Sequence, residues 1–234
     1  MRIGVVGGTG PAGTALAARL ADVGYEVVLG SRSKYRAMEA VDGLLETWAD
    51  RTLNIVSGDN NDAAKCEFVV IATPWDAAAI TARSVEHHLD GKVVVTMANA
   101  LARVDDEFVP LIPPRGSVAA SVQASLPRAR VAAAMQHVPA KELGNLAQPL
   151  NSDILVCSDD RDCTAAVTEV VSAIPGTRVL DCGNLSNATA IEAFTAVLLQ
   201  LNTRYRTRVA LRLAGLDHIP FDEPVAPARP DSSS

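Results

Sequence analysis

Three glycines near the start of the chain have the spacing of a phosphate-binding turn. They form the pattern G-x-G-x-x-G, which here reads Gly8, Thr9, Gly10, Pro11, Ala12 and Gly13. The first glycine permits a tight turn, the second lets a pyrophosphate approach the backbone, and the third lets the next helix pack closely on the strand. The free amides and the positive dipole end of that helix then face the phosphates. The spacing indicates a site for an anionic dinucleotide.

The residues around this turn supply the elements that must position it. A β-branched run over residues 3–6 precedes the turn, and an alanine- and leucine-rich helical pattern follows it to Val23. A second strand pattern covers residues 26–30. Strand, turn, helix and strand thus arrive in order within about thirty residues, as the dinucleotide-binding fingerprint requires.

The residues after the second strand indicate which dinucleotide is bound. NAD-binding chains place a carboxylate there for the ribose 2′-hydroxyl, whereas this chain has Ser31 and Arg32. Ser31 can donate a hydrogen bond to a 2′-phosphate, and the Arg32 guanidinium can pair with it in a fork. Lys34 and Arg36, in the next helical turn, are candidate helpers or simply solvated cations. The cofactor is predicted to be NADP.

Strand and helix patterns keep alternating farther along. Continuous apolar runs, as in parallel strands that are covered on both faces, predict strands over residues 67–72, 92–97, 129–135, 152–157 and 178–182. Helical patterns cover residues 76–89, 116–126 and 161–173, and the longest runs from Asn187 past Arg204, capped by Ser186 or Asn187. This alternation predicts an α/β fold with a Rossmann-type, doubly wound, mostly parallel sheet and a small C-terminal helical and αβ portion.

The length, composition and net charge of the chain limit its domain organisation and the kind of partner that it can bind. The 234 residues suit a nucleotide-binding domain over residues 1–150 and a smaller portion over residues 151–219. The Pro-, Asp- and Ser-rich residues 220–234 are predicted to be disordered. A net charge of -6 argues against nucleic acid as the main partner. No membrane-spanning run or signal peptide is expected, which favours a soluble, cytoplasmic protein.

Cysteine and histidine usage limits the chemistry. The four cysteines lack a C-x-x-C pair, so neither a metal site nor a redox dithiol is indicated. No Tyr-x-x-x-Lys pair is present, and only His137, which follows a predicted strand, is placed to face a site. The alternative is that His137 makes its hydrogen bonds within the fold, at the end of the strand, and contacts no ligand. So few acid–base groups suit hydride transfer between two bound redox cofactors, in which the protein mainly holds two rings face to face.

Five motifs in order give the chain a resemblance to the coenzyme F420-dependent NADP reductases. They are the glycine-rich turn, Gly30-Ser31-Arg32, Thr73-Pro74-Trp75, the segment Gln136-His137-Val138-Pro139-Ala140, and Leu185-Ser186-Asn187. The similarity extends over residues 1 to about 215. It implies reversible hydride transfer between NADPH and the 5-deazaflavin F420, and a homodimer.

The resemblance also implies roles for individual residues. It implies that Thr9 to Ala12, Ser31, Arg32 and Arg36 hold NADP and that Thr73, Pro74, Ala98 and Asn99 line the nicotinamide end. The wall against which the deazaflavin stacks would be Gln136, His137, Val138, Pro139 and Ala140, completed by the C-terminal portion. Some family members have histidine where this chain has Gln136, which leaves the role of His137 open.

F420 carries an anionic tail, so an acidic protein needs a local cationic patch to hold it. Arg204, Arg208 and Arg212 recur every four residues and are predicted to share one helix face. A solvated basic face is the alternative, and Arg103, Lys141 and Arg128 are the next candidates. The apolar side of the same helix is a possible subunit interface and consists of Phe194, Val197, Leu198 and Leu201.

Three other functions compete with deazaflavin reduction. An NADPH-dependent FMN or FAD oxidoreductase would resemble this chain closely. A small imine or keto-acid reductase would share the first half, but the arginine face would have no purpose. A non-catalytic NADP-sensing module would need no cleft opposite the nicotinamide, and Thr73-Pro74-Trp75 and the segment 136–140 argue against it.

Overall fold

A computed structural model describes residues 1–216 and 218–219 of the chain, so the tail predicted over residues 220–234 lies outside the described residues. The main sheet contains β1 (Arg2–Val6), β2 (Glu26–Ser31), β3 (Ile55–Asp59), β4 (Phe68–Ile71), β5 (Val93–Thr96), β8 (Arg130–Ala133), β9 (Ser152–Ser158) and β10 (Thr177–Asp181). A separate hairpin pairs β6 (Leu101–Val104) with β7 (Glu107–Pro110). The helices are α1 (Pro11–Asp22), α2 (Lys34–Thr47), α3 (Asn60–Ala64), α4 (Trp75–Ser84), α5 (Val118–Ser125), α6 (Ala140–Leu143), α7 (Arg161–Ser172) and α8 (Ala188–Tyr205).

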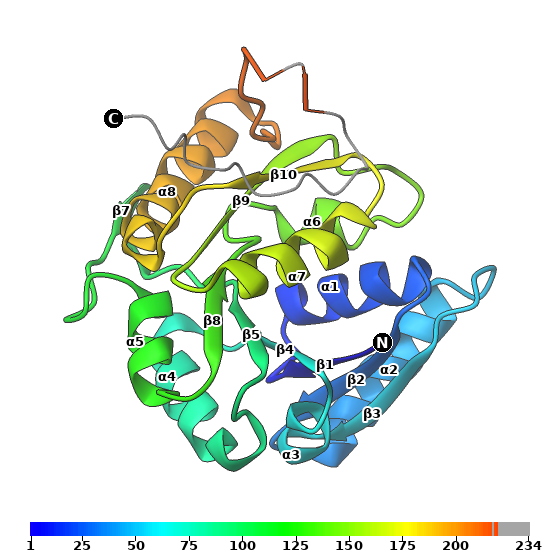
Figure 1. Ribbon diagram of the computed structural model, residues 1–234. Coiled ribbons are helices and arrows are strands. Elements are labelled where there is room, and N and C mark those ends of the chain that lie inside the picture. The colour runs from blue at the N-terminus through cyan, green and yellow to red at the C-terminus, as the bar shows by residue number, and fades with distance from the viewer. Residues whose placement is uncertain (217, 220–234) are drawn as a thin grey trace.

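The strand order confirms the predicted doubly wound sheet. The order is β10-β9-β8-β5-β4-β1-β2-β3, and every neighbouring pair is parallel except β8 with β9 (Figure 1). The order reverses at β1, where one half continues through β2 and the other through β4. Ligands of open α/β sheets bind at such a switch point, beyond the carboxyl ends of the strands. β9 and β10 extend this same sheet.

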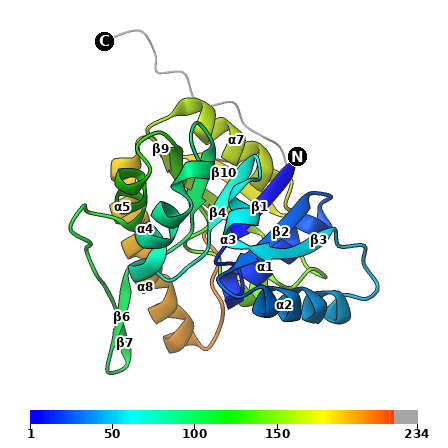
Figure 2. The same cartoon turned by 90° about the horizontal axis from the view of Figure 1, so that it is seen from below.

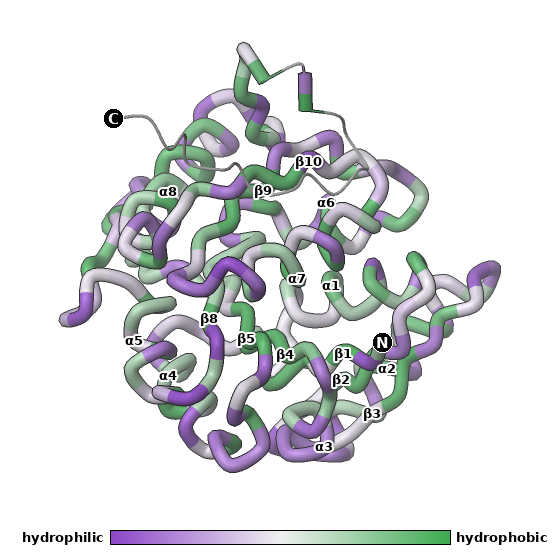
Figure 3. The backbone as a smooth tube through the Cα atoms, viewed as in Figure 1, coloured by the Kyte–Doolittle hydropathy of each residue, from purple (hydrophilic) through white to green (hydrophobic). Residues whose placement is uncertain are grey.

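Two apolar layers form because successive side chains of each strand point to opposite faces. In β1, Ile3 and Val5 pack toward α1 and α7, whereas Val6 packs toward the face that α4 and α5 cover. The central strands are correspondingly hydrophobic along their whole length (Figure 3). The predicted continuous apolar runs are therefore buried on both sides, as a parallel sheet requires.

A buried arginine ties the first helix to the second half of the chain. Arg19 of α1 is 1% exposed, and its guanidinium donates to the carbonyl oxygens of Glu142, Leu143, Asn145 and Gln148 at 2.6–3.1 Å. These carbonyls belong to α6 and the turn after it. The backbone that follows residue 140 is thus fastened to the helix that begins at the glycine-rich turn.

A second buried cation organises the C-terminal segment. Arg178 of β10 forms two 2.7 Å hydrogen bonds with the Asp153 carboxylate of β9, which is 0% exposed. Arg178 also donates to the carbonyl oxygens of Leu213 and Leu216, and the Leu213 amide donates back to Asp153. This charge pair therefore holds the chain beyond α8 against the sheet.

Helix α8 is anchored to α5 by a buried carboxylate. Glu192 is 4% exposed and accepts hydrogen bonds from the amides of Val118 (2.8 Å) and Ala119 (3.0 Å), in the first turn of α5. Burial raises the pKa of Glu192 to about 7, although the two amide bonds act in the opposite direction. Beside this anchor, Ala188 and Ile191 of α8 pack with Ala119 of α5, Ala133 of β8 and Cys157 of β9.

Several local predictions were wrong. Helix α8 ends at Tyr205 because Arg206 takes the left-handed conformation (φ 52°), so Arg204, Arg208 and Arg212 do not share a helix face. The Asn187 side chain makes no capping bond and donates instead to the Cys182 carbonyl. The helix expected over residues 76–89 is divided into α4 and a 3-10 turn, Glu86–His88.

Two elements had no clear sequence signal. The edge strand β3 and the hairpin β6–β7 were not predicted, since both are short and partly exposed. The hairpin extends beside α8 at the border of the molecule (Figure 2).

Candidate functional site

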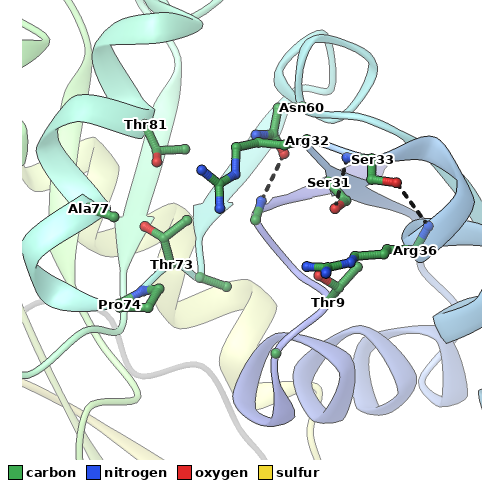
Figure 4. A pocket seen from close by; sticks show the side chains of 13 residues that line it. Thr9, Ser31, Arg32, Ser33, Arg36, Asn60, Thr73, Pro74, Ala77 and Thr81 are labelled. Carbon is green, nitrogen blue, oxygen red and sulfur yellow. Dashed lines mark hydrogen bonds between the residues drawn. The ribbon is translucent and has the colours of Figure 1, made fainter.

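Two pockets lie at the carboxyl edge of the sheet, on either side of the start of α1. The first has a volume of about 280 Å³ and is formed by the glycine-rich turn, the segment after β2 and the start of α4 (Figure 4). Its lining residues are Gly7, Thr9, Gly10, Ser31, Arg32, Ser33, Arg36, Asn60, Ala72, Thr73, Pro74, Ala77 and Thr81. The position is the one predicted for a dinucleotide.

The glycines of the turn have distinct geometric roles. The positive φ lies at Gly7 (67°) rather than at Gly8, so the tight turn depends on the residue before the motif. A Cβ at Gly13 would meet the Gly8 carbonyl oxygen at 2.5 Å, which confirms that α1 packs closely on the turn. A Cβ at Gly10 would meet nothing within 4 Å, so the open side of the turn is free for a ligand.

The start of α1 suits an anion. Gly10 is its N-cap residue without a side-chain capping bond, Pro11 occupies the first turn, and that turn carries no acidic residue. The free amide groups of a helix N-terminus carry partial positive charge, and an acidic residue there would compete with a bound phosphate. This end of the pocket therefore fits the pyrophosphate of a dinucleotide.

Serine and arginine side chains converge at the opposite end of the pocket. The Ser33 amide donates to Ser31 Oγ at 3.3 Å, which leaves the Ser31 hydroxyl proton available to a ligand. Ser33 itself caps α2 by accepting from the Arg36 amide. Arg32 and Arg36 both extend toward the pocket (Figure 4). Two cations beside a serine donor fit a 2′-phosphate.

Lys34 does not line this pocket. Its ammonium lies 3.3 Å from Asp59 and 3.6 Å from Asp62, and these carboxylates raise the pKa of Lys34. Asp59 and Asp62 cap the first turn of α3 reciprocally. Lys34 thus neutralises two carboxylates beside the pocket.

The hydroxyl of Thr73, in the lining of the first pocket, lacks a hydrogen-bond partner within the described part of the fold. Its Oγ1 is buried and has no hydrogen-bond partner among the described residues. Buried polar groups are nearly always paired, so an orphaned hydroxyl in the pocket lining is consistent with a ligand that completes it.

The second pocket, of about 260 Å³, is assembled from segments far apart in the sequence. Its lining residues are Ala12, Met97, Asn99, Leu101, Met135, Gln136, His137, Val138, Pro139, Ala140, Thr195, Leu198, Leu199, Asn202 and Val209. Ala12 lies two residues after Gly10, which lines the first pocket, so both pockets adjoin the start of α1. The predicted wall segment 136–140 forms one side, and α8 forms the other.

Hydrogen bonds hold this wall in an unusual backbone conformation. Met135 has a φ of 69°, which costs a non-glycine residue about 1–3 kcal/mol. Asn99 Nδ2 donates to the Gln136 carbonyl at 2.7 Å, and Thr195 Oγ1 lies 3.2 Å from Asn99 Oδ1. Gln136 Nε2 donates to the Thr96 carbonyl, which leaves its buried Oε1 without a partner among the described residues. The wall is therefore tied by hydrogen bonds to the end of β5 and to α8.

His137 is fixed in one tautomer by its surroundings. Its Nε2 lies 2.8 Å from the Asp153 carbonyl oxygen, which can only accept, so Nε2 carries the proton. The buried Nδ1 is an acceptor without a partner in the described chain. Burial lowers the pKa of His137, so the imidazole is neutral near pH 7. A neutral, hydrogen-bonded histidine is a poor proton donor to a ligand.

Most of the predicted site residues lie in one pocket or the other. Those that line neither are Gly8, Pro11, Gly13, Lys34 and Ala98. Pocket residues absent from the prediction include Asn60, Thr81, Met97, Thr195, Asn202 and Val209. Asn60 directly follows β3, so its place at the strand end would have been a signal had that strand been recognised.

The three C-terminal arginines are dispersed. Arg204 lies 3.6 Å from Glu107 of the hairpin, and Arg208 lies 2.9 Å from Glu142 of α6. Arg208 precedes Val209, which lines the second pocket, so the Arg208–Glu142 pair lies near that pocket's rim. Of the three, Arg208 is the best placed to meet an anionic group there.

Comparison with known proteins identifies the family of this chain. Residues 2–100 match the family model described as NADP oxidoreductase coenzyme F420-dependent. The F420-dependent NADP reductase of Methanocaldococcus jannaschii is 36% identical over 93% of this chain and 100% of that protein. The F420-dependent NADP reductase of Methanothermobacter thermautotrophicus is 34% identical over 92% of this chain and 96% of that protein.

Solved structures extend the comparison at the level of the fold. A crystal structure from Arthrobacter sp. FB24 has a TM-score of 0.78 and 24% identity and covers 92% of this chain and 99% of that one. An imine reductase from Bacillus cereus has a TM-score of 0.60 and 19% identity, and only 63% of its length is covered. Identity above 30% over nearly the full length of both chains is found with the reductases. The chain belongs to the F420-dependent NADP reductase family.

Proposed function

We propose that the protein catalyses reversible hydride transfer between NADP(H) and the 5-deazaflavin F420. The observation that carries this proposal is the pair of pockets that adjoin the N-terminus of α1, one suited to an anionic dinucleotide and one bounded by a hydrogen-bonded wall. Two ligands bound in these pockets would have adjoining ends. Such an arrangement supports a reaction between two bound cofactors.

The first pocket orients NADP through its two anionic ends. The amides at the start of α1 bind the pyrophosphate, and Ser31, Arg32 and Arg36 bind the 2′-phosphate. Pro74 and Thr73 close the side toward the nicotinamide. The protein thereby selects NADP over NAD and fixes the direction in which the dinucleotide lies.

The second pocket supplies orientation and exclusion of water rather than acid–base chemistry. The wall formed by Gln136 to Ala140 is held by Asn99, Thr195 and, behind residue 140, by Arg19. Leu198, Leu199 and Val209 make the opposite side apolar. The bound cofactors supply the hydride donor and acceptor, and the chain holds them in register. His137 stays neutral and supports the wall through Asp153.

Residues 151–219 complete the deazaflavin site in this proposal. Thr195, Leu198, Asn202 and Val209 all come from this portion. Arg208 at the rim is the candidate for the anionic tail of F420, with its partner Glu142 exchanged for the ligand.

The test is an assay of acceptor choice. Purified protein with NADPH should bleach the absorbance of F420, whereas FMN, FAD and a sample without acceptor should show at most a small fraction of that rate. Reduction of FMN as fast as F420 would reject the deazaflavin in favour of a flavin. Absence of NADPH oxidation with every acceptor, despite NADPH binding, would favour a sensing module.

We further propose that the protein is a homodimer that associates through α8 and the hairpin. Val197 of α8 is 50% exposed, Val104 of the hairpin is 54% exposed, and Ile112 just after the hairpin is 74% exposed. The hairpin strand β7 packs beside α8, and contiguous exposed apolar surface marks interfaces. Leu198, predicted for the same interface, is 7% exposed and lines the second pocket instead.

Light scattering after size-exclusion chromatography tests this assembly. Val197→Glu with Ile112→Glu should convert a dimer into a monomer because two charges would be buried. The control is Ile80→Glu, which changes an equally exposed apolar residue (75%) on α4 and should leave the dimer intact. A monomeric wild-type protein, or an unaffected dimer in the double variant, would refute this interface.

We also propose a cytoplasmic location. All four cysteines are free thiols, as is usual in reducing compartments. Among the residues that the structure describes, no helix is long and apolar enough to cross a bilayer. Fractionation of native cells with detection of the protein in the cytosolic fraction tests this location.

A further inference from the structure

Asn60 is a pocket residue whose side-chain orientation is determined by a neighbour. It follows β3 and is 8% exposed, and its Oδ1 accepts a hydrogen bond from the Gly7 amide at 3.0 Å. An N–H group can only donate, so the oxygen of the carboxamide must face Gly7. Figure 4 shows this hydrogen bond as a dashed line at the oxygen end of the Asn60 side chain. The orientation of the amide is therefore unambiguous.

The Nδ2 group of Asn60 has two protons to donate and an open pocket in front of it. Among the described residues it makes no hydrogen bond, and Asn60 lines the first pocket together with Ser31 and Arg32. The register of β2 with β3 pairs Ser31 with Asp59, so Asn60 lies directly beyond the strand end that adjoins Ser31. A donor therefore lies beside the residues that suit phosphate oxygens.

The fold alone does not require an amide at this position. The Gly7 N–H needs only an acceptor, and a carboxylate would meet that need equally well. Asp59 and Asp62, which directly flank the pair Asn60 and Asn61, are carboxylates. An aspartate at position 60 would place a negative charge in a pocket built for an anion. An asparagine accepts the hydrogen bond from the Gly7 amide, adds no charge and still has its Nδ2–H group to donate to a ligand.

We propose that Asn60 is a further ligand-binding residue of the nucleotide site, which donates an Nδ2–H hydrogen bond to a phosphate oxygen of NADP. This inference rests on the proposed function, since it takes NADP as the ligand of the first pocket. The oxygen belongs either to the pyrophosphate or to the 2′-phosphate. Both share the chemistry of an anionic acceptor, and the experiment below distinguishes them.

Asn60→Asp is the decisive substitution because it keeps the acceptor for Gly7. We expect the Kd of NADP⁺, measured by calorimetry, to rise at least tenfold, with a melting temperature equal to that of the wild type. A larger loss for NADP⁺ than for NAD⁺ assigns the 2′-phosphate, and equal losses assign the pyrophosphate. The matched control is Asn61→Asp, which adds the same charge on the exposed side of α3 and should change Kd less than twofold.

A carboxylate repels phosphates even without a lost hydrogen bond, so a second measurement is needed. In ¹⁵N-correlated NMR spectra the two Nδ2 protons of Asn60 are identified by their absence in Asn60→Asp. We expect them to shift downfield on saturation of the wild type with NADP⁺ and to stay in place on addition of F420. Unmoved resonances, or an unchanged Kd in Asn60→Asp, would overturn the proposal. A wild type that binds no NADP⁺ would instead reject the proposed function.

Discussion

The two pockets of this protein are built in different ways. The first draws most of its ligand-facing groups from short motifs, a glycine-rich turn and the residues directly after β2. The second brings together α1, β5, the wall after β8, α8 and the segment beyond it. The first pocket is shaped by the backbone of the turn and by its hydrogen bonds to Gly30 and Asn60. The second is shaped by Arg19, Asp153, Arg178 and Glu192, which are all buried.

Because of this difference, substitutions in the first pocket should change ligand affinity, whereas substitutions around the second pocket should change the stability of the fold. Cations in the first pocket are accessible to solvent and pair with no buried group, so their removal should weaken a ligand and leave the fold intact. Charges around the second pocket are buried and satisfied by the fold itself. Their removal leaves a partner unpaired in a dry environment, which costs free energy of folding first and catalysis second.

The largest effect is expected from Arg178→Met. It leaves the buried Asp153 carboxylate without its cation and should lower the free energy of unfolding by about 3–5 kcal/mol. Denaturant unfolding measures the loss. The double variant Asp153→Leu with Arg178→Met should recover much of it, because no buried charge remains. If Arg178→Met were as stable as the wild type, the buried charges around the second pocket would not determine the stability of the fold, and the contrast between the pockets would be wrong.

The next largest effect should be a dependence of the free energy of unfolding on pH, caused by Glu192. Its pKa rises from 4.5 to about 7 on folding, so the folded state binds more protons than the unfolded state between these values. The free energy of unfolding should therefore fall as pH rises from 4.5 to 7, by up to about 3 kcal/mol from this group. Glu192→Gln should flatten that slope in urea titrations. An unchanged slope would show that the amides of α5 keep the carboxylate charged.

Arg32→Ala tests the first pocket. Loss of a charge-assisted fork should weaken NADPH by about 1.5–3 kcal/mol, and NADH binding should hardly change. The melting temperature should equal that of the wild type, in contrast to Arg178→Met. Equal losses for both nucleotides would remove the assignment of Arg32 to the 2′-phosphate.

A smaller effect on turnover is expected from His137→Ala. Because His137 is neutral and supports the wall, its loss should slow F420 reduction by less than about a hundredfold, the low end of general acid–base catalysis. His137→Gln keeps a donor for the Asp153 carbonyl and should be closer to the wild type. Complete inactivation of a folded His137→Gln variant that binds both ligands would reveal a proton-transfer role.

The smallest effect should come from Lys34→Ala. Lys34 neutralises Asp59 and Asp62 at an exposed site, so its removal should raise the Kd of NADPH only a few-fold, and less at high salt. Steady-state kinetics at two ionic strengths measure this change. A loss as large as that of Arg32→Ala would mean that Lys34 contacts the 2′-phosphate directly.

Local patterns in the sequence were sufficient for the fold class and for most of the first pocket. Apolar runs indicated five parallel-type strands, and the glycine spacing with Ser31 and Arg32 indicated an NADP site, because each signal arises within a few neighbouring residues. Short or exposed elements gave no such signal. β3 was therefore missed, and with it Asn60.

The second pocket needed the tertiary structure. Asn99, Gln136 and Thr195 meet only because β5, β8 and α8 converge, and no spacing in the sequence encodes that contact. Periodicity suggested that the arginine series would continue α8, yet the helix ends where Arg206 turns left-handed and Asn202 binds the next amides. Short-range spacing thus determined most of the lining of the first pocket, whereas long-range packing of buried polar groups decided the wall of the second.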